Sequence, residues 1–407
     1  MKKVISGILV LALAIFLIAY VSCKSTPPRT QTFETASTSY SDSEVAPSSI
    51  NVYIDASGSM KGYFSLQSDQ RFIAAISNVN PAKMMWMDGK CTEIKGIPTN
   101  QFLTNNFSGG DSRFDKMLSE IITRDKLNKN DTTISLLFTD GIISASVAQT
   151  RVNPEFMKQT FIMFKNYIAN EIKKTPGIAI AMFKLDGKYN GTYWNYQNKS
   201  VPSVDILDRP FYVIAMGKPA QIRSFVKNNK LGASLQASFG VYDKQENNVP
   251  GTTFVEKNPN QWSDGTKILK LTGSDVDFYL TLPKYVADLG ADYVKKNLVI
   301  EFDGADVTEK LASLVSINSK NLTFGTWNVN DVSKPIIIPG EHQLDIKVKK
   351  TLPDGWNLLY SEDDKGVKNV ISEQKKTFAL EYLIKGIQEG LEPDDMVLFS
   401  SSIKFER

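Results

Sequence analysis

The chain has 407 residues, which is enough for two or three domains. Its formal charge is +3, and without residues 1–22, which carry Lys2 and Lys3, the balance is 45 basic against 44 acidic side chains. So small a net charge gives no general reason to expect nucleic acid or an anionic surface as a partner. With only two cysteines, Cys23 and Cys91, a disulfide framework is not expected.

The first predicted element is the apolar run from Val4 to Val21, which indicates a secretory signal peptide or a membrane anchor. It ends in Val21-Ser22-Cys23 before a polar stretch. This resembles a bacterial lipobox, with Tyr20 in place of the usual Leu and Cys23 as the lipidated mature N-terminus. The alternative is an uncleaved helix, because 18 residues are just enough to span a membrane. Both interpretations predict that the body of the protein lies outside the cytoplasm, and the lipobox resemblance implies a lipoprotein anchored in a bacterial cell envelope.

After this leader or anchor (residues 1–23), residues 24–48 are rich in Ser, Thr and Pro and predict a flexible tether. From Ser49 strand and helix patterns alternate, which predicts an α/β fold with a mostly parallel sheet between helices over residues 49–232. The strands are expected at 50–54, 82–87, 134–138, 178–185 and 211–216, and the helices at 67–79, 112–124, 153–174 and 219–230.

Two of these strands end in polar side chains. The strand at Ile50 is followed by Asp55, Ser57 and Ser59, and the strand at Ile134 by Asp140 and a glycine. In an open α/β sheet, ligands bind at the carboxyl edge of the strands. Carboxylate and hydroxyl oxygens suit a hard divalent cation such as Mg²⁺. The pattern therefore predicts a metal site shared by the two strand ends.

The sequences Asp55-Ala56-Ser57-Gly58-Ser59 and Phe138-Thr139-Asp140-Gly141 resemble the von Willebrand factor A (VWA) domain. Its metal-ion-dependent adhesion site (MIDAS) uses Asp-x-Ser-x-Ser, a distant Thr and the Asp of a strand-end Thr-Asp-Gly. The resemblance implies a Rossmann-like fold, with Mg²⁺ (or Mn²⁺ or Ca²⁺) at Asp55, Ser57, Ser59 and Asp140. It also implies that an acidic side chain of a partner protein completes the coordination of the ion.

The position of the distant Thr departs from the family pattern. After Gly109-Gly110 this chain has Asp111, with Ser112 as the nearest hydroxyl, so Asp111 is expected as a ligand and Ser112 as a possible additional one. An Asp there would strengthen cation binding and weaken the attraction of an acidic ligand. Alternatively, Arg113 pairs with Asp111 and removes it from the site.

Two further regions carry predictions. Residues 188–200 contain an Asn-Gly turn among aromatic side chains and predict a β-hairpin, whose aromatics either pack on the sheet or form a contact surface. Residues 233–407 predict a β-rich, sandwich-like region of one or two modules. Its strands are expected at 234–242, 276–282, 298–302, 322–329, 343–348 and 396–405, and its helices at 284–296 and 378–388.

These patterns favour a membrane-tethered, metal-dependent binding module that recognises another protein and is not an enzyme. One alternative is a metal-independent scaffold lipoprotein of an envelope assembly, in which partner binding would survive EDTA. A less favoured alternative is an extracytoplasmic hydrolase using Asp55, Asp111 and Asp140, with Ser112 as nucleophile. Against it, the sequence has no Gly-x-Ser-x-Gly elbow, and its single histidine, His342, lies in a predicted turn.

Overall fold

The computed structural model describes most of residues 45–406. The gaps are 66–67, 69, 88–89, 96–106, 108–111, 128, 130–131, 144–153, 195–199, 229, 242–252, 257–267, 271–277, 282–290, 318–320, 325–339, 350, 353–354, 362–365 and 392–394. The described residues form two compact units. We call them the α/β unit, Asp42–Asp243 with Leu352–Pro393, and the β-rich unit, Lys244–Thr351 with Asp394–Arg407.

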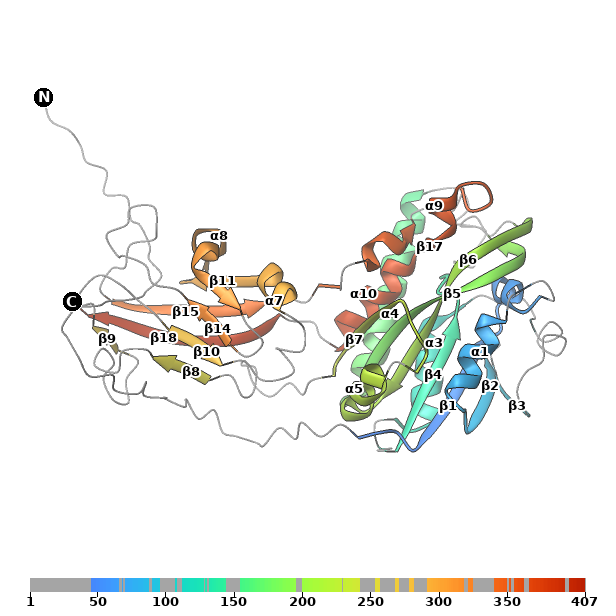
Figure 1. Cartoon of the computed structure of the whole chain (residues 1–407), viewed down its shortest axis with the longest axis horizontal. Coiled ribbons are helices and arrows are strands. Elements are labelled where there is room, and N and C mark those ends of the chain that lie inside the picture. Colours follow the sequence, from blue (N-terminus) through green and yellow to red (C-terminus); the bar gives the residue numbers. More distant parts are fainter. Residues whose placement is uncertain are drawn as a thin grey trace, which may run out of the picture. The chain divides into compact units, whose positions relative to one another are not determined.

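The α/β unit is built on a seven-stranded sheet of order β3-β2-β1-β4-β6-β5-β7 (Figure 1). Its strands are β1 (Ser49–Asp55), β2 (Lys83–Met87), β3 (Cys91–Ile94), β4 (Thr133–Thr139), β5 (Ala179–Trp194), β6 (Ser200–Gly217) and β7 (Leu235–Phe239). β1 pairs in parallel with β2 and β4, and the other neighbouring pairs are antiparallel. Four strands, β2, β1, β4 and β5, therefore run in one direction.

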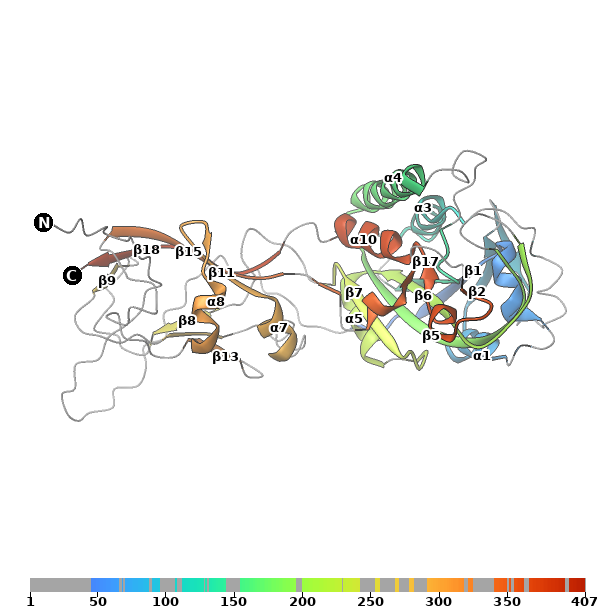
Figure 2. The same cartoon turned by 90° about the horizontal axis from the view of Figure 1, so that it is seen from above.

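Helices cover both faces of this sheet (Figure 2). On one face α1 (Arg71–Asn78), α5 (Pro219–Asn228) and the 3₁₀ helix η1 (Gly58–Phe64) pack on side chains such as Val52 and Ile54. On the other face α3 (Phe114–Arg124), α4 (Pro154–Lys173) and α10 (Leu380–Leu391) pack on Tyr53 and Leu137. Because alternate residues of a strand point to opposite faces, a sheet covered on both sides needs continuous apolar strands. That is the pattern of β1 and β4.

The segment 352–393 returns to the α/β unit after the β-rich unit. It forms η4 (Trp356–Leu359), β16 (Tyr360–Ser361), α9 (Ile371–Gln374), β17 (Thr377–Phe378) and α10. Gly386 and Gly390 of α10 lie so close to α4 that an added Cβ would come within 3.0 Å of the Lys165 and Ile172 atoms there. The expected boundary at residue 232 therefore differs from the observed one, because both α10 and β7 bury their apolar faces in the α/β unit.

The β-rich unit holds a four-stranded sheet, β13-β14-β10-β8, and a five-stranded sheet, β12-β11-β15-β18-β9. Its pairs are antiparallel except β18 with β9. The elements are β8 (Thr253–Glu256), β9 (Ile268–Lys270), β10 (Phe278–Thr281), α7 (Ala291–Asn297), β11 (Leu298–Phe302), β12 (Ala305–Asp306), α8 (Thr308–Leu311), η3 (Ala312–Leu314), β13 (Val315–Ile317), β14 (Asn321–Phe324), β15 (Gly340–Val348) and β18 (Met396–Glu406).

The predicted α/β class of the larger unit, with a large sheet between helices, is confirmed. The alternation of strand and crossover helix stops at β5, because β5 and β6 form one long antiparallel hairpin. Tyr189 and Tyr193 of this hairpin are buried and Trp194 is 40% exposed, so most of its described aromatics pack inward. Within the described part of the chain, no helix is both long and apolar enough to cross a membrane. Cys23 and the rest of residues 1–44 lie outside the described residues.

Candidate functional site

The register of β1 and β4 brings two carboxylates to one edge of the sheet. The strands are parallel neighbours, with Ile54 opposite Phe138, so Asp55 ends β1 beside the end of β4 and Asp140 follows one residue later. Both side chains are buried, at 0% and 2% exposure. The predicted convergence of Asp55 and Asp140 at adjacent strand ends is therefore confirmed.

Asp55 is held by three hydrogen bonds. Its Oδ1 accepts the Ser57 backbone N–H at 2.9 Å, and its Oδ2 accepts the hydroxyls of Thr139 at 2.8 Å and Ser112 at 3.1 Å. Burial raises the pKa of Asp55, and these hydrogen bonds oppose the rise because they stabilise the carboxylate. Ser112 lies just before α3, so this helix positions the hydroxyl at the site.

The carboxylate of Asp140 accepts fewer hydrogen bonds than that of Asp55. Its Oδ1 accepts the Ile142 backbone N–H at 3.1 Å, whereas its Oδ2 is buried with no hydrogen-bond partner among the described residues. Burial first, and then the charge of Asp55, raise the pKa of Asp140 to about 7. The side-chain hydroxyl of Ser59 lies close enough to the Asp140 carboxylate to stabilise its charged form, which opposes this rise in pKa. A buried acceptor without a donor is costly and calls for an explanation, such as an ion or a water molecule.

The two serines of the loop after β1 face each other. The hydroxyl oxygens of Ser57 and Ser59 are 3.2 Å apart, and both residues are buried. The loop continues into η1, where the Met60 backbone N–H donates to the Ser57 carbonyl at 3.1 Å. The expected residues Asp55, Ser57, Ser59, Ser112 and Asp140 thus lie within one buried group of oxygen atoms.

Asp111, the expected replacement for the family Thr, lies outside the described residues. Arg113, two residues later in the chain, is among the described residues. Its Nε and Nη2 atoms donate to the two carboxylate oxygens of Asp115 at 3.0 and 2.7 Å, and its guanidinium lies 5.4 Å from the centre of the Phe164 ring. The side chain of Arg113 is thus already engaged with α3 and α4.

Sequence reasoning did not single out two contributors to the site. Thr139 binds Asp55 and accepts the Gly141 N–H at 3.1 Å, and its signal was a hydroxyl at the end of an otherwise apolar strand. The second contributor is the β5–β6 hairpin beneath η1. Tyr63 of η1 donates to the Pro210 carbonyl, and Gly62 lies against the Tyr189 ring, where a Cβ would be only 2.3 Å from a ring atom. No local pattern marks such a contact between distant segments.

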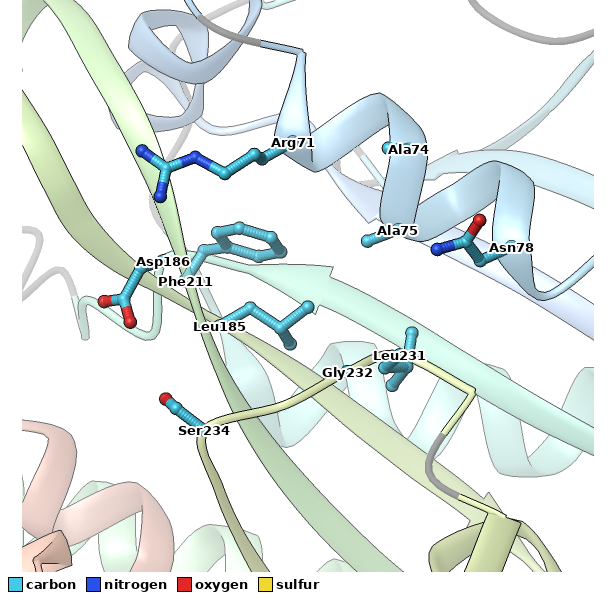
Figure 3. A pocket seen from close by; sticks show the side chains of 10 residues that line it. All are labelled: Arg71, Ala74, Ala75, Asn78, Leu185, Asp186, Phe211, Leu231, Gly232 and Ser234. Carbon is cyan, nitrogen blue, oxygen red and sulfur yellow. The ribbon is translucent and has the colours of Figure 1, made fainter.

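A separate pocket of about 360 Å³ lies between α1 and β5, β6 and the segment after α5 (Figure 3). Arg71 and Asp186 lie at one end of it. Arg71 donates to Asp208 at 3.0 Å, and Asp186 accepts Lys184 at 2.5 Å, so both charged groups are engaged within the protein. None of the oxygen-bearing site residues lines this pocket, and we assign it no ligand.

Comparison of the chain with protein-family models, with curated proteins and with solved structures found no match. Within the described ranges, no three or more His, Cys, Asp or Glu side chains gather as a metal-binding group. The described site instead combines two carboxylates with hydroxyl groups. Such an arrangement offers hard oxygen atoms to a cation, and it contains no described histidine or thiol that could transfer a proton or act as a nucleophile.

Proposed function

We propose that this protein is a membrane-tethered, extracytoplasmic binding module that holds a partner protein through a divalent metal ion at Asp55, Ser57, Ser59 and Asp140. The observation that carries the proposal is the Oδ2 atom of Asp140. It is buried beside a second buried carboxylate and accepts no hydrogen bond within the described residues, although the Ser59 hydroxyl lies near enough to stabilise the carboxylate. Two like charges in one buried place are unfavourable unless a proton or a cation compensates them.

The residues present fit a hard divalent cation. All the described candidate ligands are oxygen atoms from Asp55, Ser57, Ser59, Ser112 and Asp140, the set that Mg²⁺ and Ca²⁺ prefer over softer metals. Asp111 would join them from outside the described residues. When bound, the ion would supply positive charge for an oxygen ligand such as a carboxylate of the partner. We expect Mg²⁺ first, with Mn²⁺ and Ca²⁺ as substitutes.

We also propose that the α/β unit is a VWA domain with a MIDAS-type site. Its support is the chain order of Asp55-x-Ser57-x-Ser59 and Thr139-Asp140-Gly141, together with parallel strands β1 and β4 between helical layers. The returning segment 352–393 supplies one of those helices, α10. The envelope lipoprotein assignment rests on residues 19–23 of the sequence.

A second candidate is a metal-independent scaffold lipoprotein. The three hydrogen bonds that Asp55 accepts favour it, because they could fix the loop after β1 without any ion. We do not propose an enzyme. His342 lies on β15 of the β-rich unit, with its Nδ1 atom 2.7 Å from Asp303 and its ring stacked on Phe302.

Titration with Mg²⁺, followed by calorimetry, tests the proposal on the full-length protein in detergent. The wild type should bind Mg²⁺ and Asp55→Ala should not, while Ser135→Ala, which removes a buried hydroxyl elsewhere on β4, should bind like the wild type. A pull-down from envelope extract with and without EDTA then separates the two candidates. A partner lost with EDTA supports the metal-dependent module. A partner retained with EDTA, by a protein that binds no Mg²⁺, supports the scaffold.

A further inference from the structure

A fully buried arginine lies behind the candidate site. Arg209 of β6 is 1% exposed. Its Nη1 donates to the Gln374 carbonyl at 2.9 Å, its Nη2 donates to the Tyr193 hydroxyl at 3.2 Å, and its guanidinium stands 4.9 Å from the centre of the Tyr193 ring. The side chain is therefore fixed in one place by β5 and by the returning segment.

None of the described carboxylates forms an ion pair with Arg209; both its recorded hydrogen-bond acceptors are neutral oxygens. Burying a charge costs free energy unless another charge compensates it. The compensating charge must therefore act over a longer distance than a salt bridge.

The sheet register places Asp140 near Arg209. Thr139 of β4 lies opposite Tyr212 of β6, so the chain after Thr139 runs beside the β6 segment that precedes Tyr212 and contains Arg209. Gly141 lies so close to the Tyr212 ring that a Cβ there would be 2.7 Å from it. The site loop and β6 are joined again where Tyr63 donates to the carbonyl of Pro210, the residue after Arg209.

The electrostatic influence of both groups reaches the same tyrosines. In Tyr63, Tyr189 and Tyr212 the charge of Arg209 lowers the pKa and the charge of Asp140 raises it, against a larger rise caused by burial. One buried aromatic cluster thus lies within range of both charges.

We propose that Arg209 is a positioning residue whose fixed positive charge balances one carboxylate of the Asp55–Asp140 site and restrains the affinity of the site for divalent cations. This inference rests on the proposed metal-binding function. It adds that the cation and Arg209 repel each other, so the ion is held less tightly than two carboxylates alone would hold it.

The test compares Mg²⁺ affinities of full-length variants by calorimetry. Arg209→Met removes the charge and should tighten Mg²⁺ binding on the order of tenfold, because a unit charge acts on a doubly charged ion across a medium of low dielectric. Arg209→Gln makes the same test and keeps an N–H donor for the Gln374 carbonyl, which serves if the Met variant does not fold. A merely structural role for Arg209 would weaken binding or leave it unchanged, so the direction of the change decides.

Two matched variants keep the charge. Arg209→Lys and Tyr193→Phe disturb the same contacts and should leave the Mg²⁺ dissociation constant within about threefold of the wild type. Unchanged or weaker binding in folded Arg209→Gln and Arg209→Met overturns this inference alone, provided that the wild type binds Mg²⁺. If the wild type itself binds no Mg²⁺, both the proposed function and this inference fall.

Discussion

The hydroxyl of Thr139 donates to Oδ2 of Asp55 at 2.8 Å, across the line where β4 meets β1. The same hydroxyl oxygen accepts the backbone N–H of Gly141 at 3.1 Å. One side chain therefore holds the carboxylate of one strand and the turn that carries Asp140 after the other strand. Thr139 joins the two halves of the candidate site without being one of its expected ligands.

Thr139→Val should destabilise the protein and weaken Mg²⁺ binding. Valine keeps the shape of the side chain but has no hydroxyl group. The Asp55 carboxylate and the Gly141 N–H, both buried, then each lose one hydrogen-bond partner, which costs about 1–3 kcal/mol in the free energy of unfolding. Loss of an outer contact of this kind weakens metal binding by about tenfold or more. Urea unfolding and calorimetric Mg²⁺ titration measure the two effects.

The matched control is Ser135→Ala, which removes another buried hydroxyl from β4, one that bonds to Asp125 away from the site. It should also destabilise the protein but leave the Mg²⁺ dissociation constant within about twofold, because distant sites act independently. Equal losses of Mg²⁺ affinity in the two variants would show that Thr139 has no specific part in the site.

Without metal, the stability of the protein should fall as pH rises from 5 to 8. Burial and the charge of Asp55 raise the pKa of Asp140 in the folded state to about 7, above its ordinary value near 4 in an unfolded chain. The folded state thus favours the proton, and this stabilisation is present at low pH and is lost as pH rises through 7. Each pKa unit corresponds to about 1.4 kcal/mol, so the loss should amount to a few kcal/mol.

Urea unfolding in EDTA at pH 5, 6, 7 and 8 measures this loss. Asp140→Asn removes one of the two carboxyl groups with a raised pKa and should make the fall smaller, whereas Asp186→Asn, at a half-buried carboxylate paired with Lys184, should not. Stability that is constant or rises over this range in the wild type would show that the site carries no such strained carboxylate. If the proposed function holds, saturating Mg²⁺ should also reduce the fall, since a bound cation stabilises the folded state.

Gly62→Ala should destabilise the α/β unit by about 1–3 kcal/mol, because the added methyl group would overlap the Tyr189 ring. Lys61→Ala, at an exposed residue of the same 3₁₀ helix, is the matched control and should have little effect. In a Tyr189→Ala background the cost of Gly62→Ala should shrink. A double-mutant cycle by urea unfolding checks this, and a cost that is the same in both backgrounds would contradict the contact.

Cys91 should react slowly with alkylating reagents in the folded protein. Burial raises the pKa of its thiol to about 11, and the thiol contacts the Met87 sulfur at 2.9 Å. Since the thiolate is the reactive form, alkylation by iodoacetamide at pH 8 should be about a hundredfold slower than in urea. Mass spectrometry of the peptide that contains Cys91 follows the rate. Equal rates in the two conditions would place the thiol in an open, polar environment instead.

Much of the fold could be predicted from the chain because its elements are strongly patterned. The apolar runs of β1 and β4 and the helical spacing of Phe114, Met117, Leu118 and Ile121 mark their elements without help from distant residues. The directions of the later strands were harder to predict from the sequence. The hairpin of β5 and β6 was predicted with its turn in the wrong place, because Asn190 and Gly191, the expected turn, lie within β5 opposite Asp205 and Val204.

The candidate site also has residues that could be predicted from the sequence and residues that could not. Asp55 and Asp140 could be placed together because parallel strands end at the same edge of a sheet. Thr139 and Arg209 could not be assigned roles from sequence, since the first resembles an ordinary strand residue and the second an ordinary surface charge. Burial and long-range contacts alone distinguish them, and those exist only in the folded chain.

The return of α10 to the α/β unit has a consequence for the order in which the protein acquires its shape. Synthesis proceeds from the N-terminus, and domains generally fold as units once they are complete. Here the sheet is finished by Phe239, but the helix that covers part of one face is not made until Leu391. During that interval the apolar surface that later contacts Leu383, Ile384 and Ile387 stays uncovered. The nascent chain therefore exposes this apolar surface, which favours aggregation, until α10 has been made, and a truncation before residue 380 would make that exposure permanent.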